Sequence, residues 1–275
     1  MFYNKKEMYA PYTDTTLYPV LDISGVSDAD SFSLGFIVAD GNKNPSWGGY
    51  YSVGSDYYKD IIHKCHEKGK KLICSFGGAA GRELATVEKD AYILYEKYKK
   101  VIDTYGFDHI DFDIEGGALG DTEATKRRAY AIEDLKHTFP NLHVSLTVPV
   151  MPYGLDQDAM NVVKATPCDL VNIMAMDYGS IGKGDMGRAA CDAALNTRQQ
   201  TGKPIGITPM IGKNDTAYEI FDIGDAYTVK DFQSNCDWVK RLSIWSIERD
   251  RGVKGDMTQS SQIDQKPYEF SKIFK

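Results

Sequence analysis

The stretch VEKDAYILYEKYKKVIDTYGFDHIDFDI, residues 87–114, decides the fold class. Its apolar residues recur at helical spacing as far as Tyr105, and Gly106 is the residue type that most easily adopts the left-handed conformation at the end of a helix. Residues 107–114 follow as a short apolar run that is typical of a buried strand. A helix that passes directly into a buried strand is the unit from which α/β proteins with parallel sheets are built.

The same unit occurs on both sides of this stretch. Residues 55–68 are predicted to form a helix, and residues 71–76 are predicted to form the strand that follows it. A further helix, residues 122–139, ends before Pro140, and residues 142–148 again have the pattern of a strand. Three consecutive copies of one unit favour a parallel sheet covered by helices.

The remaining elements complete the number expected for a barrel. Outside the three units, the predicted strands are 8–10, 33–39, 170–176, 205–208 and 242–245, and the predicted helices are 156–165, 188–201 and 229–242. Eight strands that mostly alternate with helices in 275 residues are typical of a (β/α)8 TIM barrel. A doubly wound open sheet is the alternative, but no GxGxxG turn follows the first strand. No linker or low-complexity stretch is present, so we predict one α/β barrel domain over residues 1–275.

The charge balance argues against a nucleic-acid partner. The chain has 32 Lys and Arg residues against 39 Asp and Glu residues, a formal net charge of −7, and its basic runs are short, such as Lys99-Lys100. Binding to a phosphate backbone requires a basic patch. No apolar run approaches the roughly 18 residues that a membrane span needs, so we expect no membrane partner either.

Cysteine usage argues against a zinc site and against a disulfide framework. The cysteines are odd in number, irregularly spaced and without a CxxC pair: Cys65, Cys74, Cys168, Cys191 and Cys236. The chain start, residues 1–6, contains no apolar signal core. We therefore expect either an intracellular protein or one from which a targeting segment has been removed.

The end of the strand at residues 107–114 is strongly acidic. Asp111, Asp113 and Glu115 stand at positions i, i+2 and i+4, so all three share one face of the strand. In a barrel, the active site lies at the carboxyl ends of the strands. Crowding and partial burial both oppose ionisation, so we expect at least one of these carboxyls to stay protonated near neutral pH, as a general acid requires.

The acidic strand and the neighbouring glycines fit three alternative roles less well. A solvated sheet edge does not fit, because Ile110, Phe112 and Ile114 alternate with the acids and a central barrel strand has no solvated edge. A Mg²⁺ or Ca²⁺ site is a second alternative, but no nearby His or Asn run completes a ligand set. A phosphate-binding loop at Gly77 and Gly78 lacks the GK[ST] motif.

These motifs carry a resemblance to a known family. Residues 108–115, DHIDFDIE, match DxxDxDxE, the signature of glycoside hydrolase family 18, the chitinases and their relatives. Residues 75–78, SFGG, resemble the SxGG motif of the third strand, and residues 174–178, MAMDY, resemble the MxYD motif of the sixth. Trp245 resembles the eighth-strand tryptophan that forms the floor of the sugar site. Two further segments resemble compact bacterial chitinases of the chitinase D-like kind: FIVA at 36–39 and ITPMIG at 207–212.

The resemblance implies a retaining hydrolase of β-1,4-linked N-acetylglucosamine, in chitin or chito-oligosaccharides. In this family the 2-acetamido group of the substrate is the nucleophile, an exception to the use of two carboxylates. Glu115 is then the general acid and later the base, Asp113 binds the acetamido N–H, and Asp111 holds Asp113. The resemblance implies no cofactor or metal, and we expect a monomer.

The match departs from the family at one catalytic position. The family has a tyrosine before the aspartate of MxYD, whereas this chain has Met176 before Asp177. By strand alternation Tyr178 shares a face with Met176, so we expect Tyr178 to reach the site as a catalytic residue and both Met176 and Asp177 to contact the sugar. The other expected substrate contacts are Trp245, Trp47, Gly78, Tyr12 and Met151. Core packing is the alternative for Trp245, and it is as good an explanation as sugar stacking for Trp47, in a Gly-rich loop.

Two other functions remain open at this stage. One is an endo-β-N-acetylglucosaminidase that cuts the core of N-glycans, although short connections between strands and helices favour an open cleft suited to chitin. The other is a catalytically inactive, lectin-like barrel, which the presence of Glu115 disfavours. Chitin is extracellular, so the resemblance favours a secreted protein whose signal peptide is absent from this chain, whereas unpaired cysteines fit a cytoplasmic location.

Overall fold

The computed structural model of the chain describes residues 8–179 and 184–275. The chain start at residues 1–6, to which the prediction about a signal core applies, lies outside the described residues. Among the described helices, none is both long enough and apolar enough to cross a membrane.

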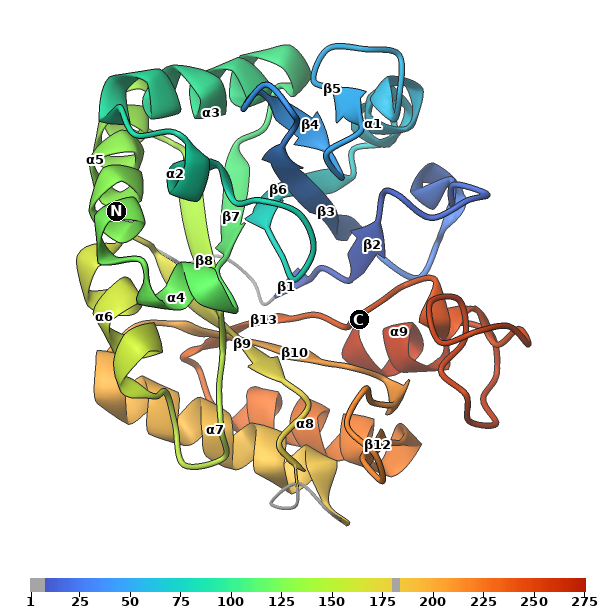
Figure 1. Cartoon of the computed structure of the whole chain (residues 1–275). Helices are drawn as coiled ribbons and strands as arrows, with labels where there is room; N and C mark the ends of the chain where they lie inside the picture. The colour runs from blue at the N-terminus through green and yellow to red at the C-terminus, as the bar shows by residue number, and fades with distance from the viewer. Residues whose placement is uncertain (1–7, 180–183) are drawn as a thin grey trace.

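Seven parallel strands lie side by side in the order of the chain, except where the ring closes (Figure 1). These strands are β3 (Ser31–Ala39), β6 (Lys71–Gly77), β7 (His109–Asp113), β8 (His143–Pro149), β9 (Leu170–Ala175), β10 (Ile205–Pro209) and β13 (Val239–Leu242). The register places Asp111 of β7 opposite Ser75 of β6 and Ser145 of β8. Residues that share a register row on one face of the barrel wall point together into its interior.

The N-terminal segment closes the ring. Strand β1 (Met8–Tyr9) pairs in parallel with β13, and β2 (Tyr12–Asp14) pairs in parallel with β3. The backbone N–H of Tyr12 donates to Ile244 O at 3.0 Å, and Ser33 N–H donates to Pro11 O at 2.9 Å. The segment that contains β1 and β2 is therefore one barrel strand, interrupted at Pro11, which has no N–H to donate. The prediction of a (β/α)8 TIM barrel is confirmed.

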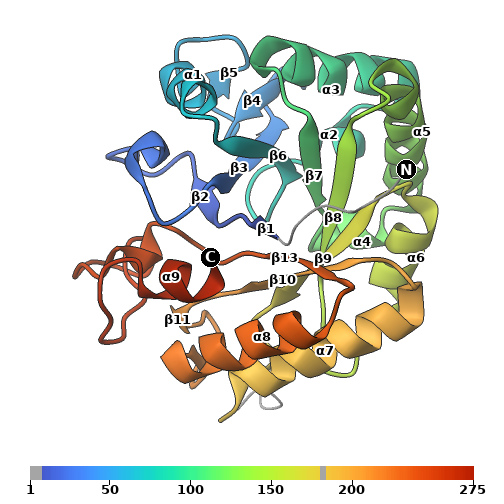
Figure 2. The same cartoon turned by 180° about the vertical axis from the view of Figure 1, so that it is seen from behind.

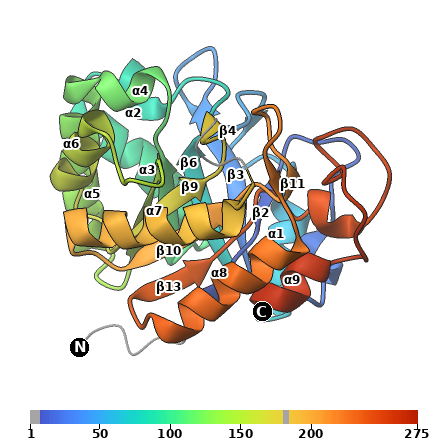
Figure 3. The same cartoon turned by 90° about the horizontal axis from the view of Figure 1, so that it is seen from below.

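Helices cover the outside of the barrel (Figure 2). The longer ones are α1 (Lys59–Glu67), α3 (Ala91–Tyr105), α5 (Thr122–Thr138), α6 (Gln157–Ala165), α7 (Met186–Thr201), α8 (Ile223–Asn235) and α9 (Glu269–Phe274), with the single turns α2 (Leu84–Val87) and α4 (Gly117–Gly120). Capping defines their ends: Asp90 accepts from Tyr92 N and Ile93 N at the start of α3, and Gly106 is left-handed at its end with φ 71°. In the view from below, α7, α8 and α9 follow one another along one side (Figure 3).

Two short strand pairs lie outside the barrel wall. Strands β4 (Pro45–Trp47) and β5 (Tyr51–Ser52) extend the sheet in antiparallel fashion beyond β3. Strands β11 (Gly212–Lys213) and β12 (Ile220–Phe221) form a separate hairpin after β10. Both pairs follow the carboxyl ends of barrel strands, where loops build the site.

The last helix and strand differ from the prediction. The predicted helix 229–242 corresponds to α8, which starts six residues earlier at Ile223, where Asp222 and Asp225 form a capping box. It ends at Asn235, so the end of the predicted helix is wrong and residues 239–242 form a strand instead. The predicted strand 242–245 is β13, which ends at Leu242. Residues 243–245 continue beyond it toward the rim, where Trp245 N–H donates to Pro209 O at 2.9 Å. The apolar run at residues 242–245 alone did not show which residues pair with the neighbouring strands β1 and β10.

Candidate active site

A cavity of about 220 Å³ opens at the carboxyl ends of the barrel strands. Six of the residues predicted for the site line it: Tyr12, Asp113, Glu115, Met176, Asp177 and Trp245. The other lining residues are Phe36, Ala79, Thr147, Met174, Thr208, Met210 and Asp215. The acids and the aromatic side chains, far apart in the sequence, therefore share one cavity.

Asp111 lies below this cavity, fully buried inside the barrel. Its Oδ2 accepts from the Tyr12 hydroxyl at 2.9 Å and from Ser75 Oγ at 2.8 Å. Thr147 Oγ1 donates at 2.9 Å, and Ser145 Oγ donates to Oδ1. These donors come from β2, β6 and β8, and the last two strands flank β7, so Asp111 is held as an acceptor from both sides.

Asp113 and Glu115 form an interacting pair in the cavity. Burial raises the pKa of Asp113 well above its usual range, and the neighbouring charges of Glu115 and Asp111 raise it further. Burial also raises the pKa of Glu115, while its hydrogen bond with Asp113 opposes that change. The pair therefore keeps a proton to a higher pH than two isolated carboxyls would.

Aromatic rings form one wall of the cavity. The Trp245 ring stacks on Phe36 with centroids 5.7 Å apart and an interplanar angle of 19°, and it lies 6.0 Å from the Tyr12 ring. Trp245 and Phe36 are both partly exposed. A wide apolar ring surface beside two carboxyls suits a sugar ring, whose C–H face is apolar and whose edge is polar.

The family is identified by comparison with known proteins. A family model described as Glycosyl hydrolases family 18 matches residues 35–208. The chain belongs to glycosyl hydrolase family 18. The match spans β3 to β10 and so includes the acidic strand β7.

Two curated relatives of this family 18 chain are similar over most of its length. It is 31% identical over 310 residues to a probable bifunctional chitinase/lysozyme from Escherichia coli (strain K12), an alignment that covers 98% of this chain and 34% of that protein. It is 30% identical over 278 residues to endochitinase 11 of Metarhizium anisopliae, covering 89% of this chain and 53% of that protein. The chain thus spans about a third and about half of the length of these two relatives.

Solved structures agree with the family assignment. The catalytic domain of a hyperthermophilic chitinase from Pyrococcus furiosus superposes with a TM-score of 0.85 at 27% identity, covering 98% of this chain and 94% of that one. Catalytic-site mutants of active domain 2 of a thermostable chitinase from the same organism, complexed with chito-oligosaccharides, superpose with a TM-score of 0.84 at 27% identity and the same coverage.

Tyr178 does not reach the family 18 site, so that prediction is wrong. Strand β9 ends at Ala175, and Asp177 has a left-handed backbone with φ 54°, which breaks the alternation on which the prediction relied. Tyr178 is buried, its N–H donates to Glu219 Oε2 at 3.0 Å, and its hydroxyl has no hydrogen-bond partner among the described residues. Met176 and Asp177 do line the cavity.

Trp47 is also not a sugar contact. It is fully buried on β4, its Nε1 donates to the Tyr105 hydroxyl at 3.0 Å, and its ring packs 5.7 Å from that of Tyr58. A Gly-rich loop indicated exposure, but the tryptophan itself anchors that loop to α3. Trp47 therefore packs in the core, as the alternative prediction had it.

Gly78 and Met151 support the structure rather than line the cavity. A Cβ at Gly78 would lie 2.7 Å from the Phe36 ring, so this glycine makes room for an aromatic ring of the wall. Met151 exchanges backbone hydrogen bonds with Gly154 at 3.1 and 2.8 Å in a turn after β8. Neither residue is among those that line the cavity.

Sequence reasoning missed several lining residues. Thr147, Met174 and Thr208 stand near the ends of β8, β9 and β10 on the inward face, so applying strand alternation to every strand would have found them. Asp215 belongs to the connection between β11 and β12, where no strand periodicity exists. Within residues 8–179 and 184–275, no group of three or more His, Cys, Asp or Glu side chains is arranged to hold a metal ion.

Proposed function

We propose that residues 1–275 form a single catalytic barrel that cleaves β-1,4-linked N-acetylglucosamine, in chitin or chito-oligosaccharides, with retention of configuration. The observation that carries this proposal is the Asp113–Glu115 pair inside a cavity walled by Trp245. Family 18 membership and the chitinases among the relatives support it.

In the proposed reaction Glu115 acts as the general acid. Its proton passes to the glycosidic oxygen while the acetamido carbonyl of the substrate attacks C1, so the bond to the leaving sugar breaks as the bond to the carbonyl oxygen forms. Water then opens the oxazolinium ion, and Glu115 takes the proton from that water. One residue thus serves as the acid and then as the base.

Asp113 has the complementary task of holding the acetamido group. Its Oδ1 has no hydrogen-bond partner among the described residues, which leaves an acceptor for the acetamido N–H. When Asp113 accepts that bond, the proton of the pair belongs on Glu115, where the acid is needed. The negative charge of Asp113 then stabilises the positive oxazolinium ion.

The cavity walls position the sugar. Trp245 offers a face for the ring, and the apolar side chains of Met174, Met176 and Met210 line the same cavity. Because Met176 stands where the family motif has tyrosine, this chain lacks that hydroxyl for the oxazolinium ion. We propose that burial and Asp113 supply the positioning instead.

The test compares a fluorogenic chitotrioside with the same leaving group on unacetylated glucosamine, using the wild type, Glu115→Gln and the exposed-helix control Glu133→Gln. Only the acetylated substrate should be cleaved, and Glu115→Gln should lower turnover by about 10²–10⁴-fold while the control stays near wild type. Unchanged turnover in Glu115→Gln would refute the assignment. Sugar binding without turnover in the wild type would indicate a lectin, and cleavage restricted to N-glycan cores would indicate the deglycosylating enzyme.

We also propose that the protein works as a monomer outside the cell. An insoluble polymer does not enter a cell, so its hydrolase has to be exported to meet it. Sedimentation of the purified chain and immunodetection in culture medium against a cytoplasmic marker test these two points.

A further inference from the structure

A buried cation lies directly beneath the acidic cluster. Arg241 of β13 is almost fully buried, its Nη2 is 3.5 Å from Asp111 Oδ1, and its Nη1 donates to Ser145 Oγ at 3.1 Å. Gly206 on β10 makes room for it, because a Cβ there would lie 3.2 Å from Arg241 Nε and 2.5 Å from Asn172 Oδ1. The barrel interior is thus built around this guanidinium.

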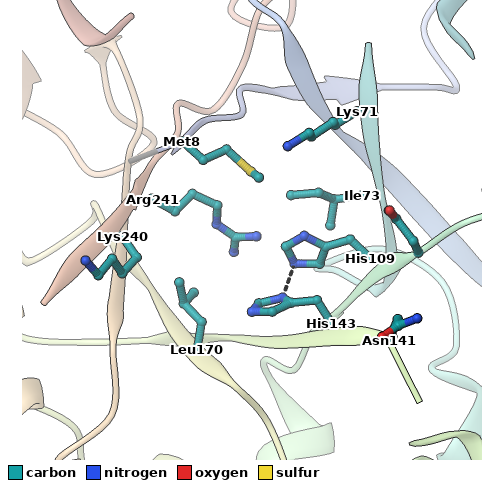
Figure 4. A pocket seen from close by; sticks show the side chains of 10 residues that line it. Met8, Lys71, Ile73, His109, Asn141, His143, Leu170, Lys240 and Arg241 are labelled. Carbon is teal, nitrogen blue, oxygen red and sulfur yellow. Dashed lines mark hydrogen bonds between the residues drawn. The ribbon is translucent and has the colours of Figure 1, made fainter. Parts of the chain in front are cut away.

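The guanidinium also faces a second cavity, of about 70 Å³, at the opposite end of the barrel (Figure 4). Lys71 and Arg241 point into it, whereas the Lys240 ammonium points away. His109 and His143 are hydrogen-bonded to each other at 2.8 Å between Nε2 and Nδ1. Asp108 also lines this cavity.

Among the described residues, Arg241 is the cation that forms an ion pair with the acidic cluster. Burial lowers the pKa of His143 to about 4, with Asp169 opposing this and Arg241 adding to it, so this imidazole is neutral at neutral pH. On the side toward the substrate cavity, Arg241 forms an ion pair with Asp111. Among the described residues that line the substrate cavity, none is a lysine or an arginine.

The effect of this charge decreases along the strand. Asp111 and Asp113 occupy alternate positions on one face of β7, about 6.7 Å apart along an extended strand, and Glu115 follows two residues beyond the end of β7. Burial and the carboxylates of Glu115 and Asp111 raise the pKa of Asp113, and the positive charge of Arg241 partly offsets that rise. Glu115 lies one step further away, so the same charge favours ionisation of Asp113 over ionisation of Glu115.

We propose that Arg241 is a positioning residue of the reaction, which, through Asp111 and its own charge, biases the proton shared by Asp113 and Glu115 toward Glu115. The inference rests on the proposed function. It assigns to the floor of the barrel a part in keeping the general acid protonated. It also explains why a guanidinium is present where an apolar core would close the barrel as well.

The test uses three variants with the chitotrioside. Arg241→Gln removes the charge but can still donate to Asp111, Arg241→Lys keeps the charge, and Lys240→Gln removes a neighbouring charge that points away. We expect Arg241→Gln to lower kcat about tenfold with little change in KM, and to move the acid limb of kcat/KM against pH upward by about one pH unit. Arg241→Lys should keep the acid limb of the kcat/KM profile at its wild-type pH. Lys240→Gln should leave both kcat and the pH of that limb near wild type.

A titration without substrate separates this inference from the proposed function. In protein labelled with ¹³C at the aspartate Cγ, and with Asp113 assigned through Asp113→Asn, Arg241→Gln should raise the pH midpoint of Asp113 by about one unit. An unchanged midpoint and an unchanged pH profile in the folded Arg241→Gln variant would overturn the inference. An inactive wild type would refute the proposed function, while the titration would still decide whether Arg241 controls Asp113.

Should Arg241→Gln not fold, the same titration compares Asp111→Asn with Asp111→Asn/Arg241→Gln, since the double variant buries neither charge of the ion pair. The Asp113 midpoint should be higher in the double variant. Equal midpoints would overturn the inference.

Discussion

The Tyr12 hydroxyl donates to Asp111 Oδ2 at 2.9 Å, although 99 positions separate the two residues in the sequence. The ring of the same tyrosine lies 6.0 Å from that of Trp245. Tyr12 therefore connects the aromatic wall of the cavity to the buried carboxylate below it. Its position depends on ring closure by the N-terminal segment, so the geometry of the site depends on that closure as well.

The two tyrosines near the site should respond differently to loss of the hydroxyl. Tyr12→Phe removes a donor to Asp111, and a hydrogen bond to a charged group is worth about 1.5–3 kcal/mol, so we expect kcat to fall about tenfold. Tyr178→Phe removes a hydroxyl that has no partner among the described residues, so turnover should stay near wild type. Steady-state kinetics on the chitotrioside measure both. A loss in Tyr178→Phe as large as in Tyr12→Phe would show that our placement of Tyr178 is wrong.

The two tryptophans should separate binding from stability. Trp245→Ala removes a ring from the cavity wall, and we expect KM for the chitotrioside to rise about tenfold, or about 1.4 kcal/mol of binding. Trp47→Phe breaks the buried hydrogen bond to Tyr105 and should lower the free energy of unfolding by about 1–3 kcal/mol without changing KM. Urea unfolding and kinetics on both variants measure the two effects. A KM increase in folded Trp47→Phe would contradict its assignment to the core.

Asp113→Asn tests whether the acetamido group takes part in the reaction. An amide can still contact the substrate, but it carries no charge to stabilise the oxazolinium ion, so we expect turnover to fall by about 10²-fold or more. The chitotrioside and an N-acetylglucosamine-thiazoline, which mimics the oxazolinium ion, provide the rate and the binding constant. The variant should bind the thiazoline more weakly than the wild type. Wild-type rates would mean that the acetamido group is not the nucleophile.

Glu248 should make the fold less stable as pH rises. Burial raises its pKa from 4.5 to about 7, with hydrogen bonds from Thr13 and Ser246 opposing the change. Between these two values the folded chain holds a proton that the unfolded chain has released, so stability decreases as pH rises from about 4.5 to about 7. The difference between the two pKa values corresponds to about 3 kcal/mol.

Replacement of this carboxyl should remove that dependence. Glu248→Gln should unfold with the wild-type free energy at about pH 4 but with up to about 3 kcal/mol more at about pH 8, as urea titrations at four pH values would measure. Burial also raises the pKa of Asp250 to about 6, so Asp250 makes stability depend on pH as well. This dependence is the same in the wild type and in Glu248→Gln, so it cancels when the two are compared. The exposed Glu133→Gln is the control. Parallel stability curves for Glu248→Gln and wild type would contradict the prediction.

Local pattern was enough to predict most of the fold. The unit at residues 87–114 combines helical spacing, a C-terminal glycine and a buried strand, and each of these is a short-range property of the chain. The boundaries of α8 and β13 were wrong because an Asp222 capping box and three or four paired residues are weaker signals than an apolar run. The interruption at Pro11 was invisible until its neighbours on β3 and β13 were known.

The site residues that follow one another along a single strand could be predicted from the sequence. Those whose direction depends on an irregular backbone conformation could not. Asp111, Asp113 and Glu115 follow from alternation alone. The position of Tyr178 did not follow from alternation, because the left-handed backbone of Asp177 changes the direction of the next side chain. No local sequence pattern marks this left-handed residue. The ion pair between Arg241 and Asp111 joins positions 130 residues apart, so only the assembled barrel brings them together.

The pairing of β1 with β13 also determines when this barrel can be completed during synthesis. The ribosome releases the first barrel strand before the others and the last one, Val239–Leu242, after them. Until then the nascent first strand has an edge with no neighbour, an edge open to wrong pairing. Asp111 likewise lacks its guanidinium until that moment, so a nascent chain that stops short of Arg241 has the three acids in sequence but not the counter-charge that they share in the finished barrel.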